Sequence, residues 1–206
     1  MNLFGSKLYR IMEWITRMAY IQILWILFTL TGFVILGIFP STVAMFAIVR
    51  DWLTGKTDIR LFSSYFKYFK ADFWKSNLLG ILITFIFLLI SIDIYYIRLN
   101  VGGSLTWTSI PLFAFMLIFL LFLFYLFPVF VHFDLKITRI LKNTFLIMLI
   151  SPIQSFFILI CLASLFIVMR FIPALAIIFG ISAYAFITMW LSLHAIHKIE
   201  SKRQFK

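Results

Sequence analysis

Residues 109–131 contain no aspartate, glutamate, lysine or arginine, and the run is long enough to cross a membrane as one helix. In lipid, a helix satisfies its backbone hydrogen bonds within one segment, whereas a barrel is built from short alternating strands. The sequence therefore predicts an all-α fold, a polytopic helical membrane bundle in one domain, residues 1–206. The five long spans are expected at 18–39, 78–97, 109–131, 145–169 and 174–193.

The composition excludes an ordinary soluble protein. Mean hydropathy is +1.11 and charged residues make up 12% of the chain, whereas soluble domains carry about a quarter. The net charge of +11 could indicate nucleic-acid binding, but these spans leave no soluble domain to carry such a site. Membrane orientation explains the charge better, so the expected partner is membrane lipid and not nucleic acid. A homo-oligomer is left open.

A proline interrupts the first apolar region. Pro40 is predicted to end the first span near Phe39, and Ser41 or Thr42 to cap a short helix over 43–53. That helix would be about 16 Å long, roughly half of a bilayer core of about 30 Å. It is therefore expected to be re-entrant or interfacial. At membrane depth it would have to be shielded by the other helices.

Residues 59–75 are predicted to form an amphipathic surface helix, because four phenylalanines recur at spacings of one helical turn. Two interpretations remain open. The helix could lie in the headgroup plane with its cations toward anionic lipid, or it could pack its phenylalanines on neighbouring spans. The predicted partner or lipid surface comprises Arg50, Arg60, Phe62, Phe66, Lys67, Phe69, Lys70, Phe73, Trp74 and Lys75. Tyr65 and Trp74 are interface residues by type.

The basic residues predict an orientation, because lysine and arginine stay on the cytoplasmic side. The segment 40–77, the polar elbow near residue 136 and the C-terminal tail are expected inside. If the short helix turns back as a hairpin, the N-terminus also lies inside and only Arg98 and Arg170 remain outside. A single crossing would instead place the basic N-terminus outside, so the hairpin is preferred.

Asp93 is the one acidic residue within a predicted span. A carboxylate in a membrane must pair, protonate or meet water. We expect a structural ion pair with Arg98 or Arg170 near the outer surface, where a turn at 100–104 follows the span. The alternative is a proton or cation site, for which the sequence offers no second acid or histidine nearby.

No set of residues predicts catalysis. The chain has no Ser/His/Asp arrangement and no glycine-rich phosphate-binding loop. His194 and His197 are three residues apart but lack a third ligand, and Cys161 lies in an apolar span. We therefore expect no catalytic, cofactor or metal site, and no enzyme.

Residues 25–80 contain a pattern of motifs that resembles a known family. An apolar span leads to a Pro-x-Thr sequence, a small-residue helix ends near a basic residue, and an aromatic-rich segment follows. The chain thereby resembles the YesL-like family of small bacterial integral membrane proteins of unknown function. Members are often encoded beside ABC-type sugar importers and polysaccharide-degrading enzymes, which implies a context. The matching residues are Pro40, Thr42, Ala44, Ala47, Arg50, Phe66, Phe69, Phe73 and Lys75.

Two functions are compatible with these patterns. The first is a non-enzymatic accessory protein of a carbohydrate ABC-type import or polysaccharide-utilisation system, which docks permease subunits through the surface between Arg50 and Lys75. The second is a small-molecule or ion carrier acting as a homo-oligomer, which would need a polar cavity built from Gln22, Gln154 and Asp93. The expected location is the bacterial plasma membrane, multi-pass, with both termini cytoplasmic.

Overall fold

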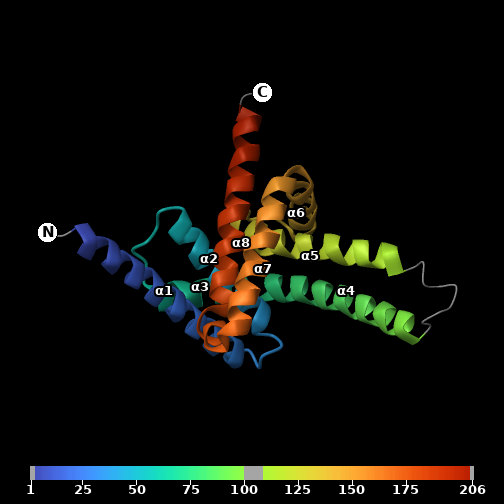
Figure 1. Ribbon diagram of the computed structural model, residues 1–206, viewed down its shortest axis with the longest axis horizontal. Coiled ribbons are helices and arrows are strands. Elements are labelled where there is room, and N and C mark those ends of the chain that lie inside the picture. Colours follow the sequence, from blue (N-terminus) through green and yellow to red (C-terminus); the bar gives the residue numbers. More distant parts are fainter. Residues whose placement is uncertain (1–2, 100–108, 205–206) are drawn as a thin grey trace.

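The computed structural model describes the backbone of residues 3–99 and 109–204. Every regular element in these two ranges is a helix (Figure 1). Five helices contain apolar stretches long enough to cross a membrane: 11–31, 73–97, 110–132, 152–171 and 173–201. The predicted all-α bundle with five long apolar helices is thus confirmed. The helices are α1 (Leu3–Thr31), α2 (Ile38–Leu53), α3 (Leu61–Ala71), α4 (Phe73–Leu99), α5 (Ser109–His132), α6 (Ile137–Ile150), α7 (Pro152–Phe171) and α8 (Pro173–Gln204).

The short helix α2 is the centre of the fold. It packs against α1, α3, α4, α5 and α8, and every residue from 40 to 49 is buried. Small side chains such as Ser41, Ala44 and Ala47 let neighbouring helices approach its backbone closely. The expectation that this helix is shielded by the others therefore agrees with its burial.

The break between α1 and α2 lies earlier than predicted. α1 ends at Thr31, residues 32–37 form consecutive turns, and α2 begins at Ile38. Pro40 sits inside the first turn of α2, where backbone N–H groups have no helical partner, so it does not end a helix. The expected serine or threonine cap is absent, because the N-cap is Gly37 and makes no side-chain hydrogen bond.

Polar contacts fasten α1 to its neighbours. Trp25 of α1 donates its indole N–H to the Thr42 hydroxyl of α2 at 3.1 Å. The amide oxygen of Gln22 accepts the backbone N–H of Ser182 in α8 at 3.0 Å. Since both α1 side chains are satisfied within the protein, they fix helix positions as interhelical hydrogen bonds do in other membrane bundles.

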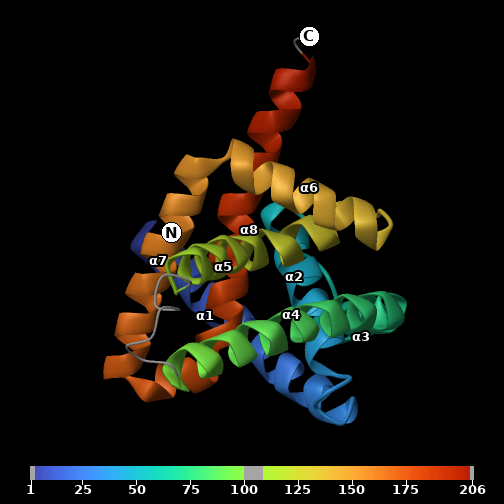
Figure 2. The same cartoon turned by 90° about the vertical axis from the view of Figure 1, so that its right-hand side faces the viewer.

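The expected fourth span, 145–169, coincides with parts of two helices. α6 ends at Ile150, Ser151 leaves the helical conformation, and α7 begins at Pro152. Proline is well placed at a first helical position and disfavours helix in the residue before it. The apolar run is therefore divided into a short helix and a span of 20 residues. Figure 2 shows α6 lying across the direction of α8.

Two long helical hairpins leave the centre in different directions. Figures 1 and 2 show α4 and α5 running side by side and across the direction of α7 and α8. The two hairpins therefore do not share one direction. The predicted turn at 100–104 lies outside the described residues.

Candidate functional site

A buried ion pair marks the end of α2. Asp51 is only 4% exposed, and its Oδ1 lies 2.9 Å from Nη2 of Arg50. The Tyr68 hydroxyl of α3 donates to Oδ2 of Asp51 at 2.6 Å. A carboxylate in the last turn of a helix is disfavoured by the helix dipole. These two partners therefore hold Asp51 in a place where an isolated acid would be unstable.

Arg50 extends this contact to a third helix. Its Nη1 donates to the backbone carbonyl of Val131 at the end of α5. Its guanidinium also lies 5.9 Å from the centroid of the Tyr68 ring, within range of a cation–π interaction. We call Arg50, Asp51, Tyr68 and the Val131 carbonyl the Asp51 cluster. The cluster joins α2, α3 and α5.

A second polar contact lies beside the cluster. Lys75, in the first turn of α4, pairs with Asp134 after α5 at 3.2 Å. Burial raises the pKa of the half-buried Asp72 carboxyl, and Asp134 raises it further, while Lys75 and Arg50 lower it. Burial likewise raises the pKa of Tyr68, reinforced by its hydrogen bond to Asp51. In both groups burial thus shifts the equilibrium toward the neutral form.

The Asp51 cluster suits a structural role. Each of its charged or hydroxyl groups already has a partner within the protein. Within residues 3–99 and 109–204, no group of three or more His, Cys, Asp or Glu side chains is arranged to hold a metal ion. The cluster can therefore fix the position of α3, and its chemistry points to scaffolding.

The face of α3 toward α2 is held by tyrosines. Tyr65 is fully buried and donates its hydroxyl to the Ser41 carbonyl at 2.7 Å. Burial raises its pKa well above the ordinary value. Tyr65 was expected at the membrane interface, and that expectation is wrong, because the residue faces the core. Phe28 of α1 stacks on its ring with centroids 5.1 Å apart.

Part of α3 and the start of α4 remain exposed. Phe62 and Phe66 are half exposed, and Trp74 is 84% exposed. These aromatic rings alternate with cations that make no ion pair among the described residues. We call this the aromatic–basic surface, and its members are Arg60, Phe62, Phe66, Lys67, Lys70 and Trp74.

The remaining members of the predicted surface are partly buried. Phe69 packs on Phe28 with ring centroids 5.1 Å apart, and Phe73 packs on Phe69 at 5.6 Å. Arg50 and Lys75 are engaged in the polar contacts described above. Phe62 and Phe66 also approach the Phe28 ring, with centroids 5.8 and 6.1 Å away, so these phenylalanines share one side of α3 and differ in how far they are exposed. Features of both interpretations of this helix are present.

The expected pair between Asp93 and Arg170 is not formed. Both residues are exposed, and the described ion pairs do not join them. Figure 1 shows why: the C-terminal ends of α4 and α7, which carry these residues, lie far apart. The side chain of Arg98 lies outside the described residues, so the alternative pair with Arg98 stays a prediction.

Sequence reasoning missed Asp51 and Tyr68. A signal for Asp51 was present, because an acid directly after a long apolar helix opposes the helix dipole and needs partners. Tyr68 gave no comparable signal, since its neighbours Lys67 and Phe69 both fit a surface helix. Its role depends on a contact 17 residues away in the chain.

Comparison with known proteins gives a consistent result. The family model described as "Protein of unknown function, DUF624" matches residues 18–94, which include Arg50, Asp51 and Tyr68. The chain is 35% identical to the uncharacterized protein YesL of Bacillus subtilis (strain 168) over 146 residues, 68% of this chain and 65% of that protein. The uncharacterized protein YteU of the same organism is 32% identical, covering 95% of this chain and 87% of its own length. The uncharacterized protein YesV of Bacillus subtilis (strain 168) is 30% identical, covering 96% of this chain and 95% of its own length. No solved structure matches.

Proposed function

The chain belongs to the DUF624 family of YesL-like proteins of unknown function, and from that premise we propose that it is an accessory protein of a carbohydrate ABC-type import or polysaccharide-utilisation system. Its five apolar helices make it a multi-pass membrane protein. The accessory role is non-enzymatic. It consists in docking a permease subunit at the bacterial plasma membrane, the context that the family resemblance implies.

The aromatic–basic surface is the observation that carries this proposal. Exposed aromatic rings and arginine are typical of the residues that dominate protein–protein contacts, and Phe62, Phe66, Trp74 and Arg60 supply them here. The surface is also held rigidly, because hydrogen bonds from Tyr65 and Tyr68 bind α3 to α2. A pre-positioned surface loses little conformational entropy when a partner binds.

The proposal places the aromatic–basic surface in the cytoplasm and α1 and α2 as a hairpin. The turn 32–37 supports this placement, since Phe33 is 89% and Ile35 is 79% exposed. The backbone N–H groups of residues 32–35 and of Gly37 donate to carbonyls of the same turn or of the end of α1. Backbone at membrane depth requires such internal hydrogen bonds. The turn is thus suited to hydrocarbon, with both ends of the hairpin on the cytoplasmic side.

Co-purification tests the docking. The full chain, solubilised in mild detergent, should recover the permease subunits of an ABC importer encoded beside it. A double variant, Phe66→Ser with Lys67→Glu, should lower recovery at least about tenfold, the loss typical of central interface residues. Phe85→Ser is a matched control, because Phe85 on α4 is 57% exposed and lies outside the surface.

Two outcomes would contradict the docking proposal. One is wild-type protein that recovers no permease. The other is equal recovery by the double variant and the wild type. If the double variant instead loses flotation with anionic vesicles while retaining permease, the surface binds lipid headgroups.

Cysteine labelling tests the orientation separately. Lys56→Cys and Lys67→Cys are made in a Cys161→Ser background, since Cys161 is the one native thiol. A membrane-impermeant maleimide should label both sites after lysis and neither on intact cells. Strong labelling of intact cells would overturn the cytoplasmic placement, whatever the pull-down shows.

The carrier alternative finds no comparable support. Gln22 is hydrogen-bonded to the backbone of α8 and does not line a path, and Asp93 lies exposed toward the outer end of α4. Residues 40–49, at the centre of the bundle, are all buried.

A further inference from the structure

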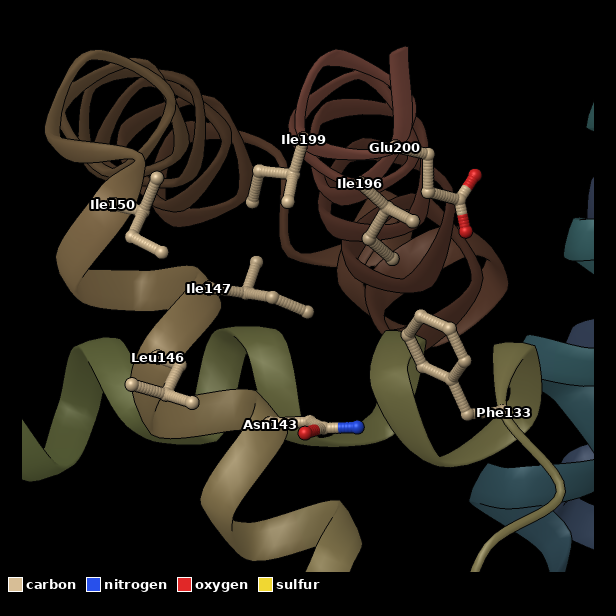
Figure 3. A pocket seen from close by; sticks show the side chains of 8 residues that line it. All are labelled: Phe133, Asn143, Leu146, Ile147, Ile150, Ile196, Ile199 and Glu200. Atoms are coloured by element: carbon tan, nitrogen blue, oxygen red, sulfur yellow. The ribbon is translucent and has the colours of Figure 1, made fainter. Parts of the chain in front are cut away.

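A pocket of about 240 Å³ opens between α6 and the C-terminal part of α8 (Figure 3). It lies away from the aromatic–basic surface and shares no residue with it. Asn143 and Glu200 supply the polar groups of its lining. Six apolar side chains form the remaining walls: Phe133, Leu146, Ile147, Ile150, Ile196 and Ile199.

The helix that forms one wall is suited to the membrane surface. α6 has 14 residues and is therefore about 21 Å long, too short to cross a bilayer core of about 30 Å. It leads directly into the span of α7 at Pro152. Leu149 and Ile150, near its C-terminal end, are 58% and 61% exposed. The apolar end of α6 thus adjoins the span of α7, and its basic residues lie toward the other end of the helix.

The charge beside the pocket is positive. Arg139 lies one helical turn before Asn143, so the two side chains share a face of α6. Arg139 and Lys142 are exposed and form no ion pair with any side chain of the described residues. Glu200, the acidic residue of the lining, does not neutralise the positive charge of Arg139 and Lys142 beside the apolar wall. Figure 3 shows the Glu200 carboxylate turned away from Ile150, and its Oε1 lies 3.8 Å from Nε2 of His132.

We propose that this pocket binds an anionic phospholipid, with one acyl chain against the isoleucine wall and the phosphate beside Arg139. An apolar pocket alone would accept any acyl chain. The unpaired cation one turn away supplies the selectivity, because basic pockets at the cytoplasmic side of membrane helices attract anionic headgroups. The site would be occupied whether or not a permease is docked.

Native mass spectrometry of the full chain in mild detergent tests this assignment. The probes are dioleoyl phosphatidylglycerol, dioleoyl phosphatidylcholine and oleate. Wild-type protein should retain one phosphatidylglycerol at a concentration at least about tenfold below that needed for phosphatidylcholine, a difference of about 1.4 kcal/mol. Oleate, which has an acyl chain but no phosphate, should bind no better than phosphatidylcholine.

Matched variants locate the site. Ile150→Trp fills the pocket from an exposed position, and Leu149→Trp puts the same ring on the neighbouring residue, which does not line it. Ile150→Trp should weaken phosphatidylglycerol retention at least about tenfold, and Leu149→Trp should leave it unchanged. Arg139→Gln should remove the preference for phosphatidylglycerol, whereas Lys136→Gln should preserve it.

Thermal melting by circular dichroism should show that all four variants fold. Equal retention of phosphatidylglycerol and phosphatidylcholine by the wild type would overturn the headgroup assignment, as would equal binding of oleate. Unchanged retention in Ile150→Trp would overturn the pocket itself. Because no permease is present, these results are independent of the docking experiment.

Discussion

Helices α2 and α4 are both strongly apolar, but they have opposite surroundings. Every residue from 40 to 49 of α2 is buried, so the helix is enclosed on all sides. In α4 beyond residue 80, burial is confined to one stripe that includes Ile83 and Ile90, and Ile81, Phe85 and Leu88 are each more than half exposed. One helix is stabilised by protein contacts, and the other requires lipid on most of its surface.

Side-chain size explains the difference better than hydropathy does. α2 carries Ser41, Thr42, Ala44 and Ala47, which allow close helix approach and interhelical hydrogen bonds. Most of α4 is built from isoleucine, leucine and phenylalanine, which hold neighbouring backbones apart and expose large apolar surfaces. A membrane helix rich in small residues is thus a candidate for the protein interior, and a bulky one for the lipid boundary.

The largest expected effect comes from breaking the Asp51 cluster. Asp51→Ala leaves Arg50 and Tyr68 without their shared acceptor at the end of the enclosed helix. We expect the free energy of unfolding to fall by about 2–4 kcal/mol, measured by denaturant titration in detergent. Asp58→Ala, in the exposed loop after α2, should change it by less than about 0.5 kcal/mol. Equal effects of the two variants would show that the cluster contributes no stability.

The next prediction concerns the point where the two helices meet. A Cβ at Gly80 of α4 would overlap the Phe39 ring of α2, whereas a Cβ at Gly180 of α8 would meet open space. Gly80→Ala should destabilise by about 1–3 kcal/mol, the usual cost of overpacking. Gly180→Ala should be neutral or stabilise by up to about 1 kcal/mol through helix propensity. The unfolding midpoint in detergent checks both, and no loss in Gly80→Ala would show that the Phe39 ring moves aside freely.

Much of this architecture could be predicted from the sequence. Long uncharged runs determine the long apolar helices, and the length of the helix near residue 45 shows that it cannot span alone. The position of the break could not be predicted, because Pro40 is tolerated in a first turn while the turn at 32–37 depends on close packing between Gly32 and Gly37. The different exposure of the four phenylalanines could not be predicted either, since spacing fixes a face but not how far each ring is covered.

Removing the Tyr65 hydroxyl should lower the free energy of unfolding by a smaller amount. Tyr65→Phe keeps the ring packed against α2 and removes only the hydroxyl bonded to the Ser41 carbonyl. The loss should be about 1 kcal/mol, the net worth of one such hydrogen bond. Tyr20→Phe changes an exposed tyrosine of α1 and should have no measurable effect on the unfolding midpoint. If Tyr65→Phe is also silent, packing alone holds α3 to the enclosed helix.

The smallest change in stability should come from replacing Asp72, at the junction of α3 and α4. Burial raises the pKa of this carboxyl, so the folded state favours its neutral form. For an acid whose pKa is raised on folding, stability is fully present below the unfolded pKa near 4 and is lost as pH rises through the higher folded value. Asp72→Asn removes that loss, because the amide is neutral at every pH.

The difference in melting temperature between Asp72→Asn and the wild type should therefore increase as the pH is raised from about 3.5 to 6.5. Three opposing contributions keep the effect small, since Lys75, Arg50 and the N-terminal end of α4 all favour the charged carboxylate. A difference that shrinks over this pH range would mean that these three outweigh burial. The junction would then be held by its charge, as the Asp51 cluster is, and the lipid-facing helix would be tied to the enclosed one by electrostatics at its first turn.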